Sequence, residues 1–482
     1  MPRRIGKNFN NVIMIKISEM PMKDEKRGMN SQIDENALRY WNGKITRRQA
    51  ISTTAKVAIA IGVGAAIAAA GIGTGVYYAS RAPPTKPEEK KLAIYHWWTA
   101  GGEREAIDAV YKLFKEKYPG VEIIDNPAAG GGGAVMRAAV KAMLLAGQPP
   151  DTFQITYGPG MVQSWAEFLE SIDDLWEGLP VPETMKKWAK VGGHYYVMPL
   201  NIHRDSNLWY NIKLVNEIGI EVPISTVDDF FKACEKAKSA GYIPFAFGTV
   251  GGQRFWLNYI LEWFMMASPN GGPDYVNDFN YGRAHPATDP AVKDALKNME
   301  TLWKNYVNSD FGALTWDEAG KLLMADKAVF NYMGDWQKGH FTASGWKPDV
   351  DFGWQPAPGT EGASIVHGDS FGVCKGAPHP TYAKAWVKLL STVEAQEAFC
   401  VIKGATPPRT DVPLDRFDPM QRRIAEYIRG HKIVVGGHGV VEAWLDKCGE
   451  ILEEFVSSFN IDKTVAALDA AYREIYPKPL EE

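Results

Sequence analysis

The sequence predicts an α/β fold, and three observations support this prediction. Short apolar runs typical of strands are mixed with long helical patterns over most of the chain. The run Leu92–Tyr95 is followed by a turn of small residues and then by Ala106, Ile107 and Val110 at helical spacing. The chain has 482 residues, which is ample for two globular lobes once its N-terminal tail is set aside.

The composition is that of an ordinary globular protein, with 45% hydrophobic and 23% charged residues. A net charge of -4 gives no indication of nucleic-acid binding. Aromatic residues reach 12% and include 16 tryptophans, which indicates a recognition surface in addition to a core. The four cysteines (Cys234, Cys374, Cys400 and Cys448) form no CxxC pair and no lipobox. We therefore expect no metal site and no cofactor, and the sequence assigns no disulfide.

The first 80 residues are excluded from the predicted fold. Residues 1–44 are polar, mixed in charge and without periodicity, so we expect a disordered cytoplasmic tail. Residues 45–80 contain Arg47-Arg48 before an uncharged run from Val57 to Tyr78, the mark of a twin-arginine export segment. About 22 helical residues span roughly 33 Å, enough to cross a bilayer. The basic residues before this run predict that the N-terminus stays in the cytoplasm.

The fate of this segment has two alternatives, a cleaved signal and a retained anchor. Signal peptides usually have a shorter apolar region of about 7–15 residues. Val76–Ala79 is a poor cleavage site, although earlier Ala-x-Ala sites exist. We therefore favour a transmembrane anchor. Residues 81–90 are rich in proline and charge, as expected of a semi-rigid linker.

Strand and helix signals alternate from Lys91 onward. The predicted strands are Leu92–Tyr95, Val121–Asn126, Thr152–Thr156, Ile243–Phe247, Phe352–Gln355 and Ser364–Val366. Pro199–Arg204 is expected to be an extended crossover, and Gly368–Gly372 is expected to be a loop. One predicted helix begins after the capping signals Ser225 and Thr226. Other predicted helices cover Phe255–Met266, Thr381–Leu390 and most of the C-terminal third.

Trp97 and Trp98 stand at the end of the first strand, and Glu103 stands at the start of the following helix. In an open α/β sheet, ligands bind beyond the carboxyl ends of the strands. Two aromatic faces and a carboxylate at that edge suit a neutral ring rich in hydroxyl groups. The alternative is a core role for at least one tryptophan, because adjacent residues of an extended chain point in opposite directions.

Two further features that follow this helix give weaker signals of a ligand site. The four-glycine run Gly130–Gly133 could cradle a phosphate, but it lacks the Lys-Ser/Thr of a P-loop and the GxGxxG spacing. A close approach of backbone to ligand, or flexibility, is the favoured interpretation. Gln154 and Thr156 alternate on one face of their strand and are candidates for polar contacts.

The order of motifs from Lys91 onward has a known counterpart. A strand with two tryptophans leads to a turn and a helix with a glutamate, and PPDTFQ, VMPLNIHR, FNYMGDW, GDSFGV and KGATPPR follow. This order resembles the extracellular solute-binding proteins (family 1) of carbohydrate ABC importers, and among them most the glucose/galactose-binding proteins. The resemblance extends from about Lys91 to the C-terminus.

The resemblance implies a two-lobed, periplasmic-binding-protein-like fold of type II, with a hinge and a sugar cleft between the lobes. The N-lobe would comprise residues 91–202 and 372–405. The C-lobe would comprise residues 203–371 and 406–482. The hinge crossings would fall near Asn201–Asp205, Asp369–Lys375 and Thr406–Arg409.

The resemblance also implies a set of sugar-binding residues that is spread over the chain. They are Trp97, Trp98, Glu103, Gln154, Thr156, His203, Trp316, Trp336, Asp369, Lys403 and His438. The aromatic residues would stack on the apolar face of a sugar ring, and the polar residues would bind its hydroxyl groups. Thr156 stands where related chains can have a histidine, which leaves the identity of the sugar open.

Several of these residues have structural alternatives. Trp316 and Trp336 could be core residues, Lys403 could be a solvated surface charge, and His438 could be a helix cap or a core histidine. Asp335 is expected to organise the turn of the GDW motif and not to bind sugar.

The expected partners are a small-molecule sugar, the transmembrane subunits of an ABC permease, and the membrane through the N-terminal helix. We expect a monomer at the extracellular face of the membrane that binds no nucleic acid and is not an enzyme. One rival is a glycosidase-like enzyme with Glu103 and Asp369 as its carboxylate pair, although no nucleophilic triad or HExxH motif is present. A second rival is a surface scaffold that binds polymers along an open groove.

Overall fold

The computed structural model describes residues 88–99, 101–129, 131–250 and 253–480 of the 482-residue chain. Lys86–Glu482 forms a compact unit by itself, separate from Met1–Thr85. The predicted tail, the predicted export segment and most of the predicted linker therefore lie outside the described residues. Within the described residues, no helix is both long enough and apolar enough to cross a membrane.

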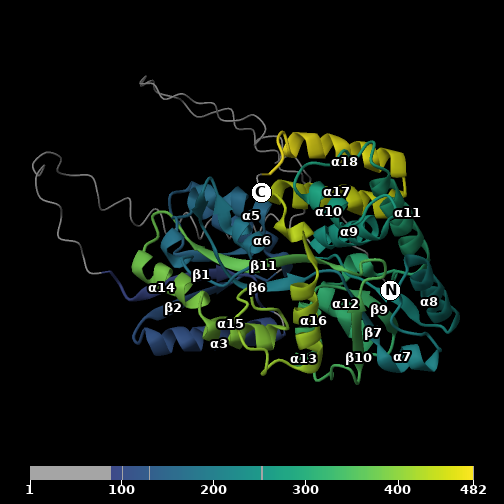
Figure 1. The fold of residues 1–482 in the computed structure, drawn as a ribbon, viewed down its shortest axis with the longest axis horizontal. Helices are drawn as coiled ribbons and strands as arrows, with labels where there is room; N and C mark the ends of the chain where they lie inside the picture. The colour runs from purple at the N-terminus through teal and green to yellow at the C-terminus, as the bar shows by residue number, and fades with distance from the viewer. Residues whose placement is uncertain (1–87, 100, 130, 251–252, 481–482) are drawn as a thin grey trace, which may run out of the picture. The chain divides into compact units, whose positions relative to one another are not determined.

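Two sheets organise the unit Lys86–Glu482 (Figure 1). The six-stranded sheet contains β1 (Lys91–His96), β2 (Glu122–Pro127), β3 (Thr152–Tyr157), β6 (Met198–Arg204), β11 (Ala363–Val373) and β12 (Lys432–Val435). The four-stranded sheet contains β7 (Asn207–Asn211), β8 (Ile243–Ala246), β9 (Ala328–Tyr332) and β10 (Phe352–Pro356). A separate two-stranded pair joins β4 (Lys190–Val191) to β5 (His194–Tyr195). The predicted α/β class is therefore confirmed, and we call the parts built on the six- and four-stranded sheets the first and second lobes.

The helices divide between the two sheets. Those packed with the first lobe are α3 (Gly102–Lys117), α4 (Ala134–Leu145), α5 (Pro159–Trp165), α14 (Pro380–Leu390) and α15 (Val393–Lys403). Those packed with the second lobe are α7 (Ile212–Glu217), α8 (Val227–Ser239), α9 (Trp256–Ala267), α11 (Pro290–Asn305), α12 (Trp316–Met324), α13 (Trp336–Ala343), α17 (Glu442–Ser458) and α18 (Ile461–Ile475). Helix α10 (Pro273–Asn280) packs against both α9 and strand β12 of the six-stranded sheet. Two others are α6 (Glu183–Lys186) and α16 (Pro419–Gly430). In Figure 1, α17 and α18 lie next to each other in yellow.

The chain passes from one sheet to the other at two clear places. Strand β6 ends at Arg204 in the six-stranded sheet, and β7 begins at Asn207 in the four-stranded sheet. Strand β10 ends at Pro356 in the four-stranded sheet, and β11 begins at Ala363 in the six-stranded sheet. The predicted extended crossover over Pro199–Arg204 is confirmed, because this segment is strand β6. The lobe boundaries and the three hinge crossings stay a prediction.

The predicted loop at Gly368–Gly372 is wrong, because these residues continue β11. The segment is antiparallel to β3 on one side and to β6 on the other, so its backbone groups are paired with neighbouring strands. Glycine has a packing role here: a Cβ at Gly368 would lie 2.3 Å from the carbonyl oxygen of Asn201. The small residues that suggested a loop therefore allow two strands to approach closely.

Other local predictions hold. The Thr226 side chain accepts the backbone N–H of Asp229 and begins α8, as its capping signal indicates. In β1, Leu92 and Ile94 are fully buried while Lys91 and Ala93 are partly exposed, which is the alternation expected of a strand. All four cysteines are buried and free.

Candidate functional site

A cavity between the two lobes collects nine of the eleven residues predicted from the sequence. Its wall consists of Trp97, Trp98, Glu103, Gly132, His203, Trp256, Trp316, Trp336, His367, Asp369, Lys403 and His438. The cavity holds about 350 Å³ of space free of atoms, part of it open to solvent. The side chains of the wall fill most of the space between the lobes at this point.

Four helices begin at the cavity. Trp256, Trp316 and Trp336 are the first residues of α9, α12 and α13, and Glu103 is in the first turn of α3. A helix N-terminus carries a partial positive charge from its unpaired N–H groups and its dipole. The four helices therefore place aromatic faces and a positive potential around the same space, which favours the two carboxylates in its wall.

A capping box fixes where α12 begins. The Thr315 side chain accepts the backbone N–H of Glu318, and the Glu318 side chain accepts the backbone N–H of Thr315. The backbone N–H of Trp316 donates to Oε1 of Gln253 at 3.0 Å. These contacts hold the Trp316 ring, which is 4% exposed, at the cavity wall.

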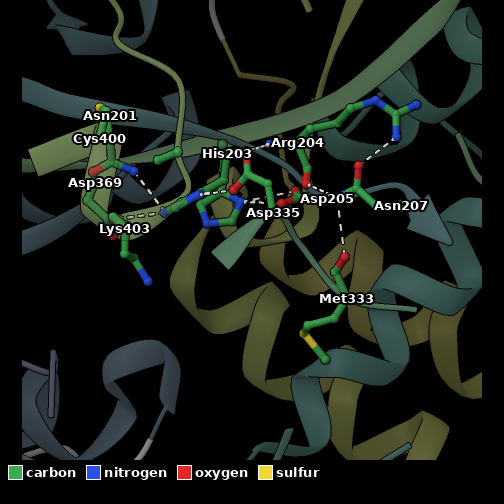
Figure 2. A network of polar contacts seen from close by, with 12 residues as sticks. Asn201, His203, Arg204, Asp205, Asn207, Met333, Asp335, Asp369, Cys400 and Lys403 are labelled. Carbon is green, nitrogen blue, oxygen red and sulfur yellow. Dashed lines mark hydrogen bonds and ion pairs between the residues drawn. The ribbon is translucent and has the colours of Figure 1, made fainter. Parts of the chain in front are cut away.

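His203 lies between two carboxylates, as Figure 2 shows. Its Nδ1 contacts Oδ1 of Asp335 at 2.5 Å, and its Nε2 contacts Oδ2 of Asp369 at 3.1 Å. The side-chain amide of Asn201 also lies 2.8 Å from Nε2. All of these side chains are buried. The His203 imidazole, on β6, is thereby held in one orientation by Asp335 at the start of α13 and by Asp369 on β11.

The protonation states of this group follow from burial and from the neighbouring charges. Burial lowers the pKa of His203, but Asp335 and then Asp369 raise it more, to about 9. Burial raises the pKa of Asp369, but the hydrogen bond and the charge of His203 lower it to about 2. At neutral pH the cavity wall therefore presents an imidazolium and an ionised Asp369.

Asp335 lies behind His203 and does not line the cavity. Its carboxylate makes no capping hydrogen bond to α13 and accepts the backbone N–H of Arg204 at 3.1 Å. The prediction that this side chain organises the GDW turn is therefore wrong. The reason is tertiary: β6 passes the start of α13 and offers a buried N–H and an imidazole, which bind the carboxylate instead.

Lys403 and Glu103 form an ion pair across the first lobe. Nζ of Lys403 lies 2.5 Å from Oε1 of Glu103, and the Lys403 side chain is 3% exposed. The ammonium group is also 5.9 Å from the centre of the Trp336 ring. The alternative of a solvated surface charge at Lys403 is therefore wrong, because α15 packs along α3 and brings this residue to the cavity.

Gln154 and Thr156 lie on β3 behind the cavity wall. Nε2 of Gln154 donates to Oδ1 of Asp369 at 2.8 Å, and Oε1 of Gln154 accepts the backbone N–H of Trp97 at 3.1 Å. Thr156 stands opposite Asp369 in the strand register, and its hydroxyl has no hydrogen-bond partner among the described residues. The structure thus gives Gln154 a positioning contact to two cavity residues.

The two adjacent tryptophans have different surroundings. Trp98 is fully buried, with its ring 4.6 Å from Phe399 and 5.8 Å from Phe371, so it packs in the core as well as facing the cavity. Trp97 is 7% exposed and packs against Gly133, where a Cβ would lie 2.3 Å from the indole. The glycine run therefore approaches aromatic rings closely, while the predicted approach of its backbone to a ligand stays a prediction.

Two cavity residues, Trp256 and His367, were not among those predicted from the sequence, whereas Gly132 belongs to the glycine run predicted to approach a ligand. His367 precedes Asp369 by two residues on β11, and side chains two apart on a strand face the same way. This signal was missed because Gly368–Gly372 was predicted to be a loop. Trp256 carries no comparable signal, because an aromatic residue at the start of an apolar helix is equally suited to the core.

His367 and His438 are neutral, in contrast to His203. Burial and then the charge of His203 lower the pKa of His367 to about 3, and burial lowers the pKa of His438 well below its ordinary value. Nδ1 of His367 lies 2.8 Å from Oδ1 of Asp205. The His438 ring lies 4.5 Å from the ring of Phe255 and 5.1 Å from that of His367, so it is packed among aromatic rings.

The chain is similar to known proteins over most of this unit. The family described as bacterial extracellular solute-binding protein matches residues 100–397. An uncharacterized ABC transporter extracellular-binding protein of Pyrococcus horikoshii is 37% identical over 412 residues, covering 83% of this chain and 91% of that protein. A probable sugar-binding periplasmic protein of Brucella melitensis is 31% identical over 357 residues, covering 70% of this chain and 80% of that protein.

Among solved structures, a chitin oligosaccharide binding protein has a TM-score of 0.70 with this chain at 20% sequence identity. The match covers 80% of this chain and 99% of that one. The predicted two-lobed, periplasmic-binding-protein-like fold is therefore confirmed for the described residues.

Proposed function

The chain belongs to the family of bacterial extracellular solute-binding proteins, and on this basis we propose that it is the sugar-binding component of an ABC importer. The observation that carries the proposal is the composition of the cavity wall. Five tryptophans surround an ion-paired Glu103 and an ionised Asp369 between two lobes. A sugar ring has apolar C–H faces and a rim of hydroxyl groups, and this wall offers partners for both. The printed name of the Brucella melitensis relative supports the same ligand class.

The proposed ligand is a monosaccharide of the glucose or galactose kind, or a short oligosaccharide. Support comes from the place of the cavity, whose wall takes side chains from both lobes. Such a space suits a ligand of one or a few rings better than a polymer along an open groove. The bound sugar would be delivered to the transmembrane subunits of the importer at the extracellular face of the membrane.

The proposed contacts to the sugar are divided by chemistry. The tryptophans would face the ring, and Glu103, Asp369 and Lys403 would bind hydroxyl groups through charge-assisted hydrogen bonds. His438, whose Nε2 has no hydrogen-bond partner among the described residues, would make a further polar contact. Gln154 would act by holding Asp369 and the backbone of Trp97. Direct sugar contacts of Gln154 and Thr156 stay a prediction.

The family binds solutes and is not enzymatic, in agreement with the prediction from the sequence. The charges of the cavity argue in the same direction. A glycosidase needs one carboxyl group with a raised pKa as proton donor. The pKa of Asp369 is lowered to about 2 by the neighbouring His203 against the effect of burial, and the carboxylate of Glu103 is bound by Lys403.

A thermal-shift screen tests the proposal. A chain that begins at Lys86 should melt at a higher temperature with at least one of D-glucose, D-galactose, D-xylose or maltose, because a ligand that binds only the folded state stabilises it. Chromatography of the recovered sugar should show it unchanged. No shift with any of these sugars would contradict the proposed ligand class, and a hydrolysed or isomerised product would favour an enzyme.

A pair of tryptophan variants tests the site. Trp336→Ala should weaken sugar binding in calorimetry on the order of tenfold or more, since stacked rings contribute to affinity. Trp303→Ala is the matched control: Trp303 is also buried in the second lobe, but it lies outside the cavity wall. This control should lower the melting temperature and leave the affinity unchanged. Equal affinity in both variants would place Trp336 in the core.

A further inference from the structure

Arg137 in α4 is a buried cation that binds the opposite lobe. Its side chain is 2% exposed, and its Nε donates to Oε1 of Glu442 at 2.6 Å. Helix α4 packs against β1 of the six-stranded sheet, whereas α17, which begins at Glu442, packs against α9 and α18. The ion pair therefore joins the first lobe to the second, and it links residues 305 positions apart.

The same guanidinium reaches the cavity wall. Nη1 of Arg137 donates to the backbone carbonyl of Gly132, which lines the cavity. Gly132 has φ +72°, and a Cβ there would lie 2.2 Å from Cζ of Phe255 in the second lobe. The next residue, Gly133, packs against the indole of Trp97 in the first lobe. Arg137 thus holds a piece of backbone that lies between an aromatic ring of each lobe.

The start of α17 makes a further contact with the first lobe. The backbone N–H of Glu442 donates to Oγ of Ser164 in α5 at 3.3 Å. A Cβ at Gly160, also in α5, would lie 2.2 Å from the backbone nitrogen of Val441. The N-terminus of α17 is therefore packed tightly against the first lobe at the point where Arg137 arrives, and its dipole favours the carboxylate of Glu442.

We propose that Arg137 is a positioning residue of the sugar site, and that its pair with Glu442 is a latch between the lobes. Removing one partner of a buried ion pair leaves the other charge without compensation. Separation of the lobes must break the pair and expose Arg137 to water, so the latch favours the closed arrangement. It also keeps the Gly132 backbone against the cavity, so it slows release of the bound sugar. The kinetic part of this inference rests on the proposed sugar-binding function.

Stopped-flow tryptophan fluorescence with D-glucose and D-galactose tests the latch. Glu442→Gln and Arg137→Met should each raise the rate constant of release on the order of ten- to a hundredfold, the scale of a lost charged hydrogen bond, and should leave the association rate constant nearly unchanged. The double variant should release sugar no faster than the single variants, because both remove the same pair.

Glu450→Gln is the matched control. Glu450 lies on the same helix as Glu442, but its partner Arg254, at 2.8 Å, belongs to the second lobe. This control should release sugar at the wild-type rate. A wild-type release rate in Glu442→Gln, additive effects in the double variant, or an equal acceleration in Glu450→Gln would overturn the latch.

Small-angle scattering without sugar separates failure of the latch from failure of the proposed function. The radius of gyration of Glu442→Gln should exceed that of the wild type and of Glu450→Gln, since fewer contacts then hold the lobes together. This result would support the latch even if neither sugar binds. Equal radii in all three proteins would overturn it, whichever sugar the protein takes.

Discussion

At the scale of single residues, the charge of Asp369 is fixed by partners that come from three other strands and helices. Gln154 and His203 bind its two oxygens, and the charge of Lys403 also lowers its pKa. The carboxylate is thus ionised and oriented before any ligand arrives. Preorganised acceptors of this kind cost little reorganisation on binding.

The first prediction concerns this carboxylate. Asp369→Asn should weaken binding of the sugar found by thermal shift on the order of ten- to a hundredfold, because a charged hydrogen bond contributes about 1.5–3 kcal/mol. Titration calorimetry measures the change. Asp151→Asn is the control: Asp151 is also a fully buried carboxylate, which accepts the backbone N–H groups of Ala93 and His379 away from the cavity. Undiminished affinity in Asp369→Asn would contradict the proposed contact.

The second prediction concerns pH. The pKa of His203 is raised from 6.5 to about 9, so its charge stabilises the fold fully below about pH 6.5, and this stability is lost as the pH rises to 9. The pKa of Asp369 is lowered from 3.8 to about 2, so its contribution is present above pH 3.8 and is lost as the pH falls to 2. Between pH 3.8 and pH 6.5, His203 and Asp369 both contribute in full.

Urea unfolding at a series of pH values measures this dependence. The free energy of unfolding should fall between pH 6.5 and 9 by up to about 1.4 kcal/mol per pH unit from His203. Burial raises the pKa of Glu262 to about 8, so this group also lowers the free energy of unfolding as the pH rises through this range. The quantity to compare is therefore the difference in slope between the wild type and His203→Gln. An unchanged slope in His203→Gln would contradict the charged state.

At the scale of elements, the site is built where helices begin. Three tryptophans of the cavity wall are first residues of helices, and at α12 the capping box that fixes the helix start also places the ring of Trp316. The β11 strand contributes in another way, because its period of two places His367 and Asp369 on the same face. The cap of α12 and the register of β11 therefore each bring side chains to the cavity.

The third prediction tests this link between a cap and the site. Thr315→Ala and Thr226→Ala each remove a capping side chain and should each cost about 1 kcal/mol in the free energy of unfolding. Sugar affinity should fall several-fold in Thr315→Ala, because Trp316 follows that cap. It should stay constant in Thr226→Ala, which caps α8 away from the cavity. Equal affinities in the two variants would show that the cap of α12 does not fix the position of Trp316.

At the scale of the whole molecule, the sequence divides into a predicted export segment and the compact unit Lys86–Glu482. The compact unit begins at Lys86, within the proline-rich linker predicted at residues 81–90. The fourth prediction concerns the route outward: replacing Arg47 and Arg48 by lysine should leave the binding unit inside the cell, as a twin-arginine segment requires both arginines. Cell fractionation with an antibody against the unit measures its location. Export at the wild-type level would contradict the twin-arginine assignment.

The sequence by itself determined the class of fold and most of its elements. The run Leu92–Tyr95, the capping signal at Thr226 and the apolar spacing of α3 are local patterns, and a local pattern is set by residues a few positions apart. The order of motifs, with nine residues that line the cavity, was also visible. Where a local signal was ambiguous, as in the glycines of GDSFG, the prediction of a loop failed, because the strand there depends on partners far away in the chain.

Only the tertiary structure decided which of these residues meet. Glu103 and Lys403 are 300 positions apart and pair because α15 packs along α3. Gln154 binds Asp369 and Trp97, where the sequence suggested a sugar contact, because β11 is antiparallel to β3. The charge of His203 depends on carboxylates that are 132 and 166 positions away. Such contacts follow from the packing of the lobes and from burial in a low-dielectric interior, and neither is encoded in the spacing of neighbouring residues.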